Sequence, residues 1–235
     1  MCTDPPMAEP DVILARAGHD LRGELATMVT GVHYLMRYES NLGETAKQML
    51  ERVDGAGKRL SRLLDELELA AWIDGRPPGA LVVEPFRIGP LVEGAISRLS
   101  NTIAQRGVTV EADLPADLAE RTGDAELLGK AVEHLLDFAV ARSPGRAVHV
   151  RATGPAALSV ADEGGPVDDA VIARLFVPFV EKDLIPRPEP GARRRERLGL
   201  GLAIARGIFA AHGGGMSASL APGGGGIALS CTLVG

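Results

Sequence analysis

The stretch Ala157-Leu-Ser-Val-Ala-Asp-Glu-Gly-Gly165 alternates apolar and small polar residues and then ends in two acids and two glycines. Such alternation is typical of a β-strand buried on one face, and the ending is typical of a turn. A similar run precedes it at residues 147–151, and apolar residues have helical spacing over residues 127–139 and 200–211. Helices and strands in this order predict an α+β fold, a sandwich with helices on one face of a mixed sheet. Further helices are expected over residues 88–99 and 170–176, and further strands over 108–112, 216–220 and 227–234.

Two segments earlier in the chain have the spacing of bundle helices. The first carries apolar or small residues at alternating steps of four and three: Leu14, Gly18, Leu21, Leu25, Met28, Val32 and Leu35. The second carries a similar series before the helix-breaking Asp74-Gly-Arg-Pro-Pro-Gly: Val53, Ala56, Leu60, Leu63, Leu67 and Ala70. A helical hairpin is predicted over residues 11–76, and the α/β sandwich over 81–235. Because two helices leave half of each apolar face exposed, we expect a homodimer in which two hairpins form a four-helix bundle.

Composition excludes several classes of function. The 235 residues contain 25 Lys and Arg against 31 Asp and Glu, a net charge of -6, and only 3% are aromatic. Nucleic acids and anionic membranes need a basic face, so neither is an expected partner. Cys2 and Cys231 lie far apart in the sequence, so no disulfide framework or metal site is assigned to them. The sequence has neither an apolar run of the ~20 residues that span a bilayer nor a signal segment, and we expect a cytoplasmic protein.

Six short motifs follow one another along nearly the whole chain. They read His19-Asp-Leu-Arg-Gly-Glu-Leu, Leu60-Ser-Arg-Leu-Leu-Asp-Glu-Leu, Asp124-Ala-Glu-Leu-Leu, Asp162-Glu-Gly-Gly, Phe176-Val-Pro-Phe and Gly199-Leu-Gly-Leu-Ala-Ile. In this order they resemble the catalytic core of sensor histidine kinases, from the phosphoacceptor box to the second glycine box. The resemblance implies a dimerisation and phosphotransfer hairpin, followed by a histidine-kinase-type ATPase domain with the Bergerat fold.

His19 and Asp20 are the candidate catalytic residues. A neutral imidazole attacks phosphorus near pH 7, and an adjacent carboxylate that holds one ring N–H leaves the other nitrogen free to attack. His19 follows Gly18 of the apolar series, so we expect it on the flank of the bundle, within reach of a second protein. The resemblance implies that this partner is the receiver domain of a response regulator. Taken alone, the pair also fits an ordinary polar helix face.

Asp162, Gly164, Gly199 and Gly201 are the candidate nucleotide-binding residues. Glycines at the start of a helix let an anionic ligand approach the backbone N–H groups, which suits phosphates. By the resemblance, Asp162 accepts the amino group of adenine, and ATP and Mg²⁺ are the implied cofactors. Taken alone, the two later glycines also fit a turn that packs a helix against a strand, and Asp162 fits a residue that ends a strand.

The chain departs from the family pattern at several of these motifs. His134 and Phe138 stand where two asparagines of the asparagine box are expected. Mg²⁺ requires oxygen ligands, which neither side chain supplies. Pro166 replaces a glycine of the first glycine box, and Arg197 replaces a glycine of the second. Gly23 replaces a polar residue to which the resemblance assigns a role in phosphatase activity. We therefore expect both the kinase and the phosphatase machinery to be impaired.

Three functions remain open. The first is a His-Asp phosphotransfer protein that uses His19 and keeps the nucleotide domain as a docking surface. The second is an active histidine kinase, without its own sensor, that uses substitute Mg²⁺ ligands. The third is a pseudokinase scaffold in which His19 is idle. The altered asparagine box favours the first and third over the second, and the intact His19-Asp20 pair favours the first over the third. The basic run Arg193–Arg197 fits either a phosphate clamp or a solvated loop.

Overall fold

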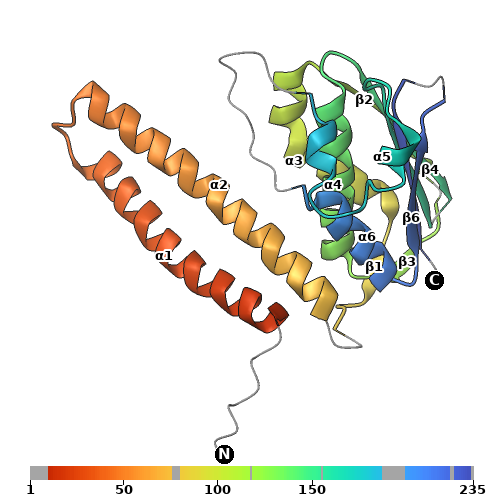
Figure 1. Ribbon diagram of the computed structural model, residues 1–235, viewed down its shortest axis with the longest axis horizontal. Helices are drawn as coiled ribbons and strands as arrows, with labels where there is room; N and C mark the ends of the chain where they lie inside the picture. The colour runs from red at the N-terminus through yellow and green to blue at the C-terminus, as the bar shows by residue number, and fades with distance from the viewer. Residues whose placement is uncertain are drawn as a thin grey trace, which may run out of the picture. The chain divides into compact units, whose positions relative to one another are not determined.

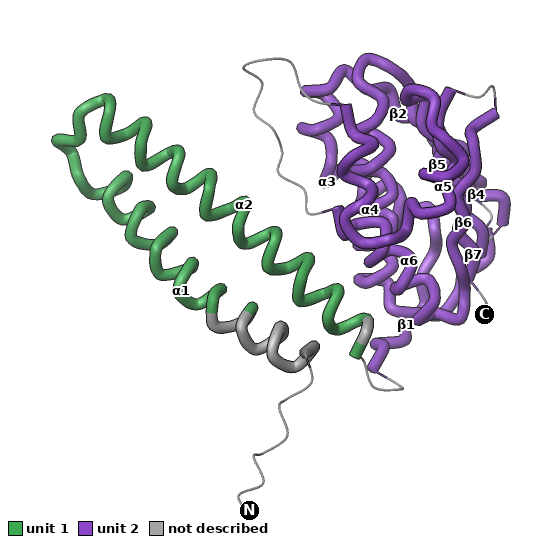
Figure 2. The backbone as a smooth tube through the Cα atoms, in the orientation of Figure 1, with its two compact units in different colours: residues 1–76 green, residues 77–235 purple. Residues whose placement is uncertain are grey.

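The structure, a computed structural model, describes residues 10–75, 80–116, 118–154, 156–186, 199–222 and 225–233, without the side chains of residues 10–17, 19, 20 and 74. The chain folds as two compact units, residues 1–76 and 77–235 (Figure 2). The basic run Arg193–Arg197 and Cys2 lie outside the described residues. No helix in the described ranges is both long and apolar enough to cross a membrane.

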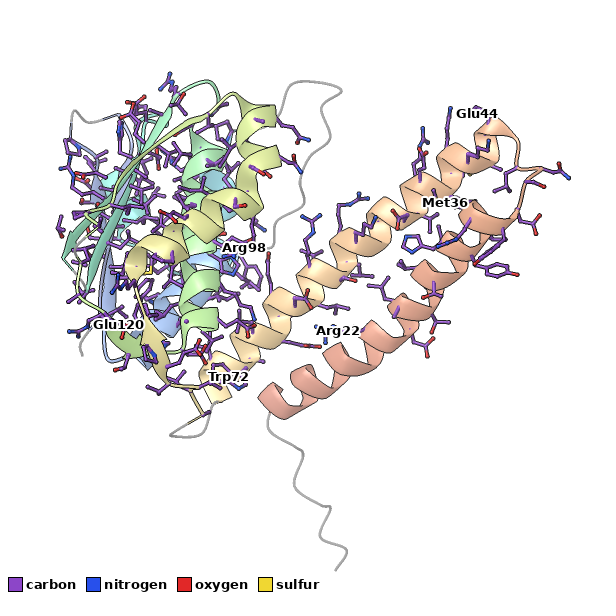
Figure 3. All side chains as sticks on the ribbon, turned by 180° about the vertical axis from the view of Figure 1, so that it is seen from behind. Arg22, Met36, Glu44, Trp72, Arg98 and Glu120 are labelled. Atoms are coloured by element: carbon purple, nitrogen blue, oxygen red, sulfur yellow. The ribbon has the colours of Figure 1, made fainter. Side chains whose placement is uncertain are left out.

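The first unit is the predicted helical hairpin. Helix α1, Pro10–Tyr38, is followed by a turn over residues 39–43 and by helix α2, Glu44–Gly75 (Figure 1). Arg22 of α1, labelled in Figure 3, forms ion pairs with two carboxylates of α2, Asp65 and Glu68, each at 2.6 Å. These groups are partly solvated, so the contacts fix the alignment of the two helices more than they stabilise them.

The residues of the predicted apolar series of α1 form two sets, and within each set the residues are seven positions apart and share one environment. The buried set is Gly18, Leu25 and Val32. The exposed set, with 41% to 63% of each residue accessible, is Leu21, Met28 and Leu35. A seven-residue spacing keeps each set on one side of the helix. Three residues of the predicted series are therefore used inside the hairpin and three are left uncovered in a single chain, while the side chain of Leu14 lies outside the described residues.

Helix α2 corrects one detail of the predicted pattern. The described residues of α2 that are fully buried are Gly57, Leu64 and Ala71, which the predicted series does not contain. Val53 and Leu60, which it does contain, are 44% and 48% exposed. Gly57 lies directly against Val29 of α1. The close approach of the two helices requires a glycine there, and a search for large apolar residues overlooks such a position.

The second unit contains the predicted mixture of helices and strands. Its helices are α3 (Ile88–Arg106), α4 (Ala125–Arg142), α5 (Asp169–Ile172), the 3-10 helix η1 (Glu181–Leu184) and α6 (Gly201–Ala211). Its strands are β1 (Glu84–Phe86), β2 (Thr109–Asp113), β3 (Arg121–Gly123), β4 (Ala147–Gly154), β5 (Ala157–Asp162), β6 (Gly215–Leu220) and β7 (Ile227–Thr232). The expected helix near 170–176 is only the four residues of α5.

The strands form a mixed sheet covered by helices. Its order is β2-β4-β5-β7-β6, with β2 and β4 parallel and the other neighbours antiparallel. Helices α3, α4 and α6 lie on one face of this sheet (Figure 1). Strands β1 and β3 form a separate antiparallel pair that the sequence did not predict. The α+β prediction, with helices on one side of a mixed sheet, is confirmed.

Helix α4 carries several site residues, and its start is fixed by Asp124. The carboxylate of Asp124 accepts the Leu127 N–H at 3.0 Å and the Val82 N–H at 3.1 Å. The Asp124 N–H donates to Nε2 of His212 at 2.9 Å, which ties α4 to the end of α6. A capping carboxylate satisfies a helix N–H group that has no partner within the helix. The positions of the later residues of α4 are set from this end.

Candidate functional site

The candidate phosphoacceptor pair lies in α1. The side chains of His19 and Asp20 are outside the described residues, but their helical neighbours are described. Gly18 is buried against α2, where a Cβ atom would come 2.9 Å from Oε1 of Glu68. Gly23 has no heavy atom within 4 Å of its Cβ direction, so this position is open and offers no side chain to a reaction.

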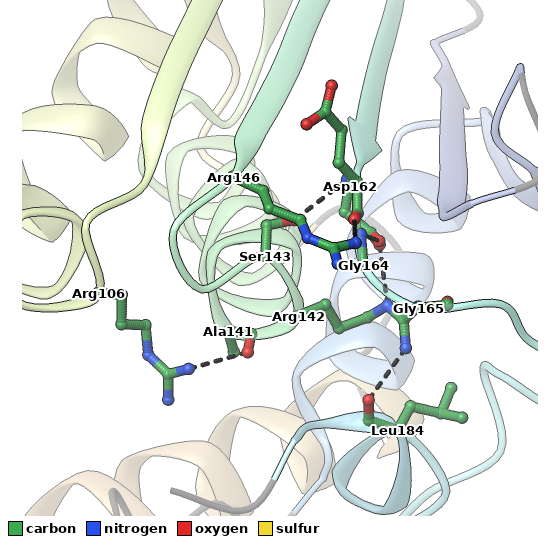
Figure 4. A network of polar contacts seen from close by, with 10 residues as sticks. Arg106, Ala141, Arg142, Ser143, Arg146, Asp162, Gly164, Gly165 and Leu184 are labelled. Carbon is green, nitrogen blue, oxygen red and sulfur yellow. Dashed lines mark hydrogen bonds and ion pairs between the residues drawn. The ribbon is translucent and has the colours of Figure 1, made fainter. Parts of the chain in front are cut away.

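Asp162 ends β5 and is enclosed. Its carboxylate accepts Nε of Arg142 at 3.0 Å on one oxygen and the Gly164 N–H at 2.8 Å on the other (Figure 4). The side chains of Arg142 and Asp162 are only 4% and 1% exposed. Burial raises the pKa of Asp162, and the charge of Arg142 together with backbone hydrogen bonds from Gly164 and Ile227 opposes that shift. Both oxygens of the predicted adenine acceptor are thus engaged within the protein.

Arg142, the last residue of α4, binds through all three of its nitrogens. Besides Asp162, it donates to the carbonyl oxygens of Leu184 at 3.0 Å and Gly165 at 2.8 Å (Figure 4). A Cβ atom at Gly164 would come 2.6 Å from Oδ1 of Asp162 and 2.9 Å from Nη2 of Arg142. In this structure, Gly164 is therefore required by the packing around the buried ion pair.

Gly199 and Gly201 lie where α6 begins, and both are closely packed. Gly199 has a φ of 81°, and a Cβ there would come 3.1 Å from Cα of Phe179. The Phe179 N–H donates to the Gly199 carbonyl at 2.7 Å. A Cβ at Gly201 would come 3.0 Å from Nδ1 of His134 and 3.3 Å from Oε1 of Glu181. The interpretation of these glycines as packing positions is supported by this geometry.

Glu181 places a carboxylate at the start of α6. Its Oε2 accepts the Leu202 N–H at 2.6 Å, and the residue is 4% exposed. The partial positive charge of a helix N-terminus stabilises such a group. The sequence predicts that phosphates bind at this end of α6, and in the structure a side chain of the protein lies there.

The altered asparagine box supplies no oxygen cluster for a metal. Phe138 is 1% exposed and lies in the core, and Glu133 pairs with Arg98 at 2.6 Å. Within the described parts of the chain, no group of three or more His, Cys, Asp and Glu side chains is arranged to hold a metal ion. With Asp162 and the start of α6 also engaged, the residues that the structure describes at this site do not fit a complex of ATP with Mg²⁺.

Sequence reasoning missed both residues that engage these groups, Arg142 and Glu181. Arg142 had a detectable signal, because it follows the largely apolar run 131–141 at a spacing that places it in the core. A buried arginine needs a counter-charge. Glu181 had no such signal, since it lies in a short segment without periodicity. Gly226 was also missed; it lies directly against the carbonyl of Asp162.

Comparison with known proteins identifies a family for the second unit. Residues 123–233 match the family described as histidine kinase-, DNA gyrase B- and HSP90-like ATPases. The sensor protein DivL of Caulobacter vibrioides is 29% identical over 216 residues, which are 90% of this chain and 26% of DivL. The probable sensor histidine kinase TcrY of Mycobacterium tuberculosis is 31% identical over 215 residues, 89% of this chain and 43% of TcrY. The chain thus spans less than half the length of each relative.

Solved structures share the fold. Full-length ShkA in complex with AMPPNP has a TM-score of 0.78 at 21% identity, over 95% of this chain and 45% of that chain. The histidine kinase AdeS of Acinetobacter baumannii has a TM-score of 0.60 at 20% identity, over 92% of this chain and 96% of the AdeS chain. The domain at residues 123–233 belongs to the histidine kinase-like ATPase family. The relatives align with the hairpin as well as with this domain, which confirms the predicted sensor histidine kinase catalytic core.

Proposed function

We propose that this chain is a His-Asp phosphotransfer protein whose ATP-dependent autophosphorylation is impaired. His19 receives phosphate from an aspartate on the receiver domain of a response regulator, and returns it. One observation carries the proposal: the sequence keeps the adjacent pair His19-Asp20, whereas the asparagine box contributes the buried ring of Phe138. A reaction with a phosphorylated partner does not use the asparagine box.

The proposed transfer requires little from this chain beyond an imidazole. One ring nitrogen of His19 attacks the phosphorus of the partner's aspartyl phosphate. The bond between phosphorus and the carboxylate oxygen breaks, and the aspartate leaves as a carboxylate. Asp20 holds the proton on the other ring nitrogen, which keeps the attacking nitrogen unprotonated. The receiver domain brings the Mg²⁺ that neutralises the phosphate charge, so the chain needs no metal of its own.

Labelled receiver domains test this function. Receivers from the same genome are phosphorylated with a radioactive small phosphodonor, freed of the donor and mixed with the chain. We expect the label to appear on the chain in an acid-labile and base-stable form, as a phosphohistidine requires. A failure to exchange phosphate with any receiver would favour the pseudokinase scaffold instead.

Autophosphorylation separates the proposal from an active kinase. With radioactive ATP and Mg²⁺, we expect no more label on the wild-type chain than on His19→Ala, because Mg²⁺ neutralises charge in phosphoryl transfer and Phe138 provides no ligand. Phe138→Asn is expected to remain inactive, since Arg142 and Glu181 still engage the groups that a nucleotide would use. If the wild type is strongly labelled and His19→Ala is not, the chain is an active histidine kinase.

The hairpin is proposed to form a homodimer through the exposed apolar set of α1. Leu21, Met28 and Leu35 are 56%, 63% and 41% exposed in a single chain, and covering each of them contributes roughly 1 to 3 kcal/mol. In sedimentation at micromolar concentration we expect a dimer, and a monomer for Met28→Glu with Leu35→Glu. Thr30→Glu, on the opposite side of α1, is the matched control and should stay dimeric. A wild-type monomer would contradict the proposed bundle.

A further inference from the structure

The N-terminal end of α6 is well suited to an anion. The first N–H groups of a helix have no partner within it, and the helix dipole adds partial positive charge there. One of these groups, the N–H of Leu202, donates to Oε2 of Glu181 at 2.6 Å. The residue is 4% exposed, so its carboxylate lies inside the protein. The short distance is typical of a hydrogen bond with a charged acceptor.

Contacts on both sides hold Glu181 in this position. It is the first residue of η1, Glu181–Leu184. Before η1, the Phe179 N–H donates to the Gly199 carbonyl at 2.7 Å, and the two residues have φ angles of 72° and 81°. At the end of η1, Arg142 donates to the Leu184 carbonyl at 3.0 Å. A positive φ is uncommon for phenylalanine, so the surrounding contacts must maintain this backbone.

Asp162 is the second group that a nucleotide would need, and it is equally engaged. Its two oxygens accept the Gly164 N–H at 2.8 Å and Nε of Arg142 at 3.0 Å. The side chains of Asp162 and Arg142 are only 1% and 4% exposed, so a ligand's amino group reaches this carboxylate only if Arg142 moves away from it. The guanidinium would then be buried without its counter-charge, which is strongly unfavourable.

We infer that the nucleotide-recognition groups of this domain are occupied by the chain's own side chains: Arg142 replaces a ligand's amino group at Asp162, and Glu181 replaces a ligand's phosphate at α6. Each side chain has the character of the group that it replaces, a donor at the carboxylate and an anion at the helix end. A phosphate binds to α6 only after Glu181 has left, and adenine is excluded while Arg142 pairs with Asp162. The inference concerns the second unit and does not depend on phosphotransfer at His19.

Equilibrium binding tests this inference. Inorganic tripolyphosphate, ADP and adenosine are titrated into the full chain by isothermal calorimetry. We expect no measurable binding to the wild type. Glu181→Ala removes a like charge and frees the Leu202 N–H, so we expect it to bind tripolyphosphate and ADP at least about tenfold more tightly. Adenosine carries no phosphate and should bind to neither protein.

Two further variants make the result specific. Asp183→Ala removes an exposed carboxylate from the same 3-10 helix and should behave as the wild type. Glu181→Gln keeps an oxygen for the Leu202 N–H but carries no charge, so its affinity for tripolyphosphate should lie between those of the wild type and Glu181→Ala. Circular dichroism establishes that each variant is folded, and Glu181→Gln provides the comparison if Glu181→Ala is not.

Two results would overturn the inference. One is a wild-type chain that binds ADP or tripolyphosphate as tightly as folded Glu181 variants do. The other is binding of adenosine to the wild type, which would mean that Arg142 does not exclude a purine. Neither result bears on exchange of phosphate between His19 and a receiver, so the two proposals fail separately.

Discussion

His19→Ala should abolish exchange of phosphate with a receiver domain, while Phe138→Leu should exchange at nearly the wild-type rate. The proposed reaction passes through one atom of this chain, a ring nitrogen of His19, and alanine has no nucleophile to replace it. Phe138 lies in the core of the second unit, and leucine preserves most of its volume. The measurement is the rate at which label moves between the receiver and the chain.

Asp20→Asn refines the same experiment. The amide keeps the shape of the side chain but has no charge, so it holds the proton of the neighbouring imidazole less strongly. We expect slower transfer with the site of labelling unchanged. Label that reaches the chain in His19→Ala would contradict the proposal, because the phosphate would then reside on another residue.

Arg142→Leu should lower the free energy of unfolding by about 3 to 5 kcal/mol, because breaking a buried ion pair leaves the remaining charge uncompensated. Asp162 would lose its counter-charge, and the carbonyls of Gly165 and Leu184 would each lose a donor. Urea denaturation followed by circular dichroism measures the change as a shift of the transition assigned to the second unit.

The pH dependence of this variant has a definite sign. Burial raises the pKa of Asp162, and Arg142 opposes that effect. The folded-state pKa of Asp162 is already raised with Arg142 present, and removing Arg142 raises it further, so protonation of Asp162 favours the folded variant more than the folded wild type. The loss of stability should therefore be smaller at about pH 5 than at about pH 8.

Two controls accompany Arg142→Leu. Adding Asp162→Asn removes the stranded charge and should recover part of the loss. Arg146→Leu replaces a nearby exposed arginine, whose bond to the Glu163 carbonyl is 2.8 Å long, and should change the stability by less than about 0.5 kcal/mol. An equally small effect of Arg142→Leu would show that the buried pair does not form in solution.

The longer helices and strands of the second unit could be predicted because each is long enough to repeat its pattern of apolar residues. Helix α4 repeats apolar residues over 18 positions, and β4 alternates over eight. Strands β1 and β3 have three residues each, too few to show an alternation, and they were missed. Periodicity needs several residues of one element before it distinguishes a strand from a turn.

The sequence could indicate candidate residues of the site but not the distant residues that contact them. Asp162 and Gly201 could be named as candidates because a carboxylate after a strand and a glycine before a helix are local signals, and their role in nucleotide binding stays a prediction. The residues that engage these groups are distant in the sequence: Arg142 lies 20 positions from Asp162, and Glu181 lies 21 positions from Leu202, whose N–H it accepts. Local spacing predicts which face of an element a residue occupies, but not which distant residue meets that face. His19 and Asp20 remain predictions, since their side chains lie outside the described residues.

The two sets of α1 residues that repeat every seven positions have different environments. Gly18, Leu25 and Val32 are buried in the single chain, whereas Leu21, Met28 and Leu35 remain exposed. Exchange of the exposed set therefore leaves the buried residues of α1 unchanged. Two sister chains with the same buried set and different exposed sets would fold alike and yet sort into separate pairs. In the proposed dimer, the exposed set selects the partner and the buried set stabilises the hairpin.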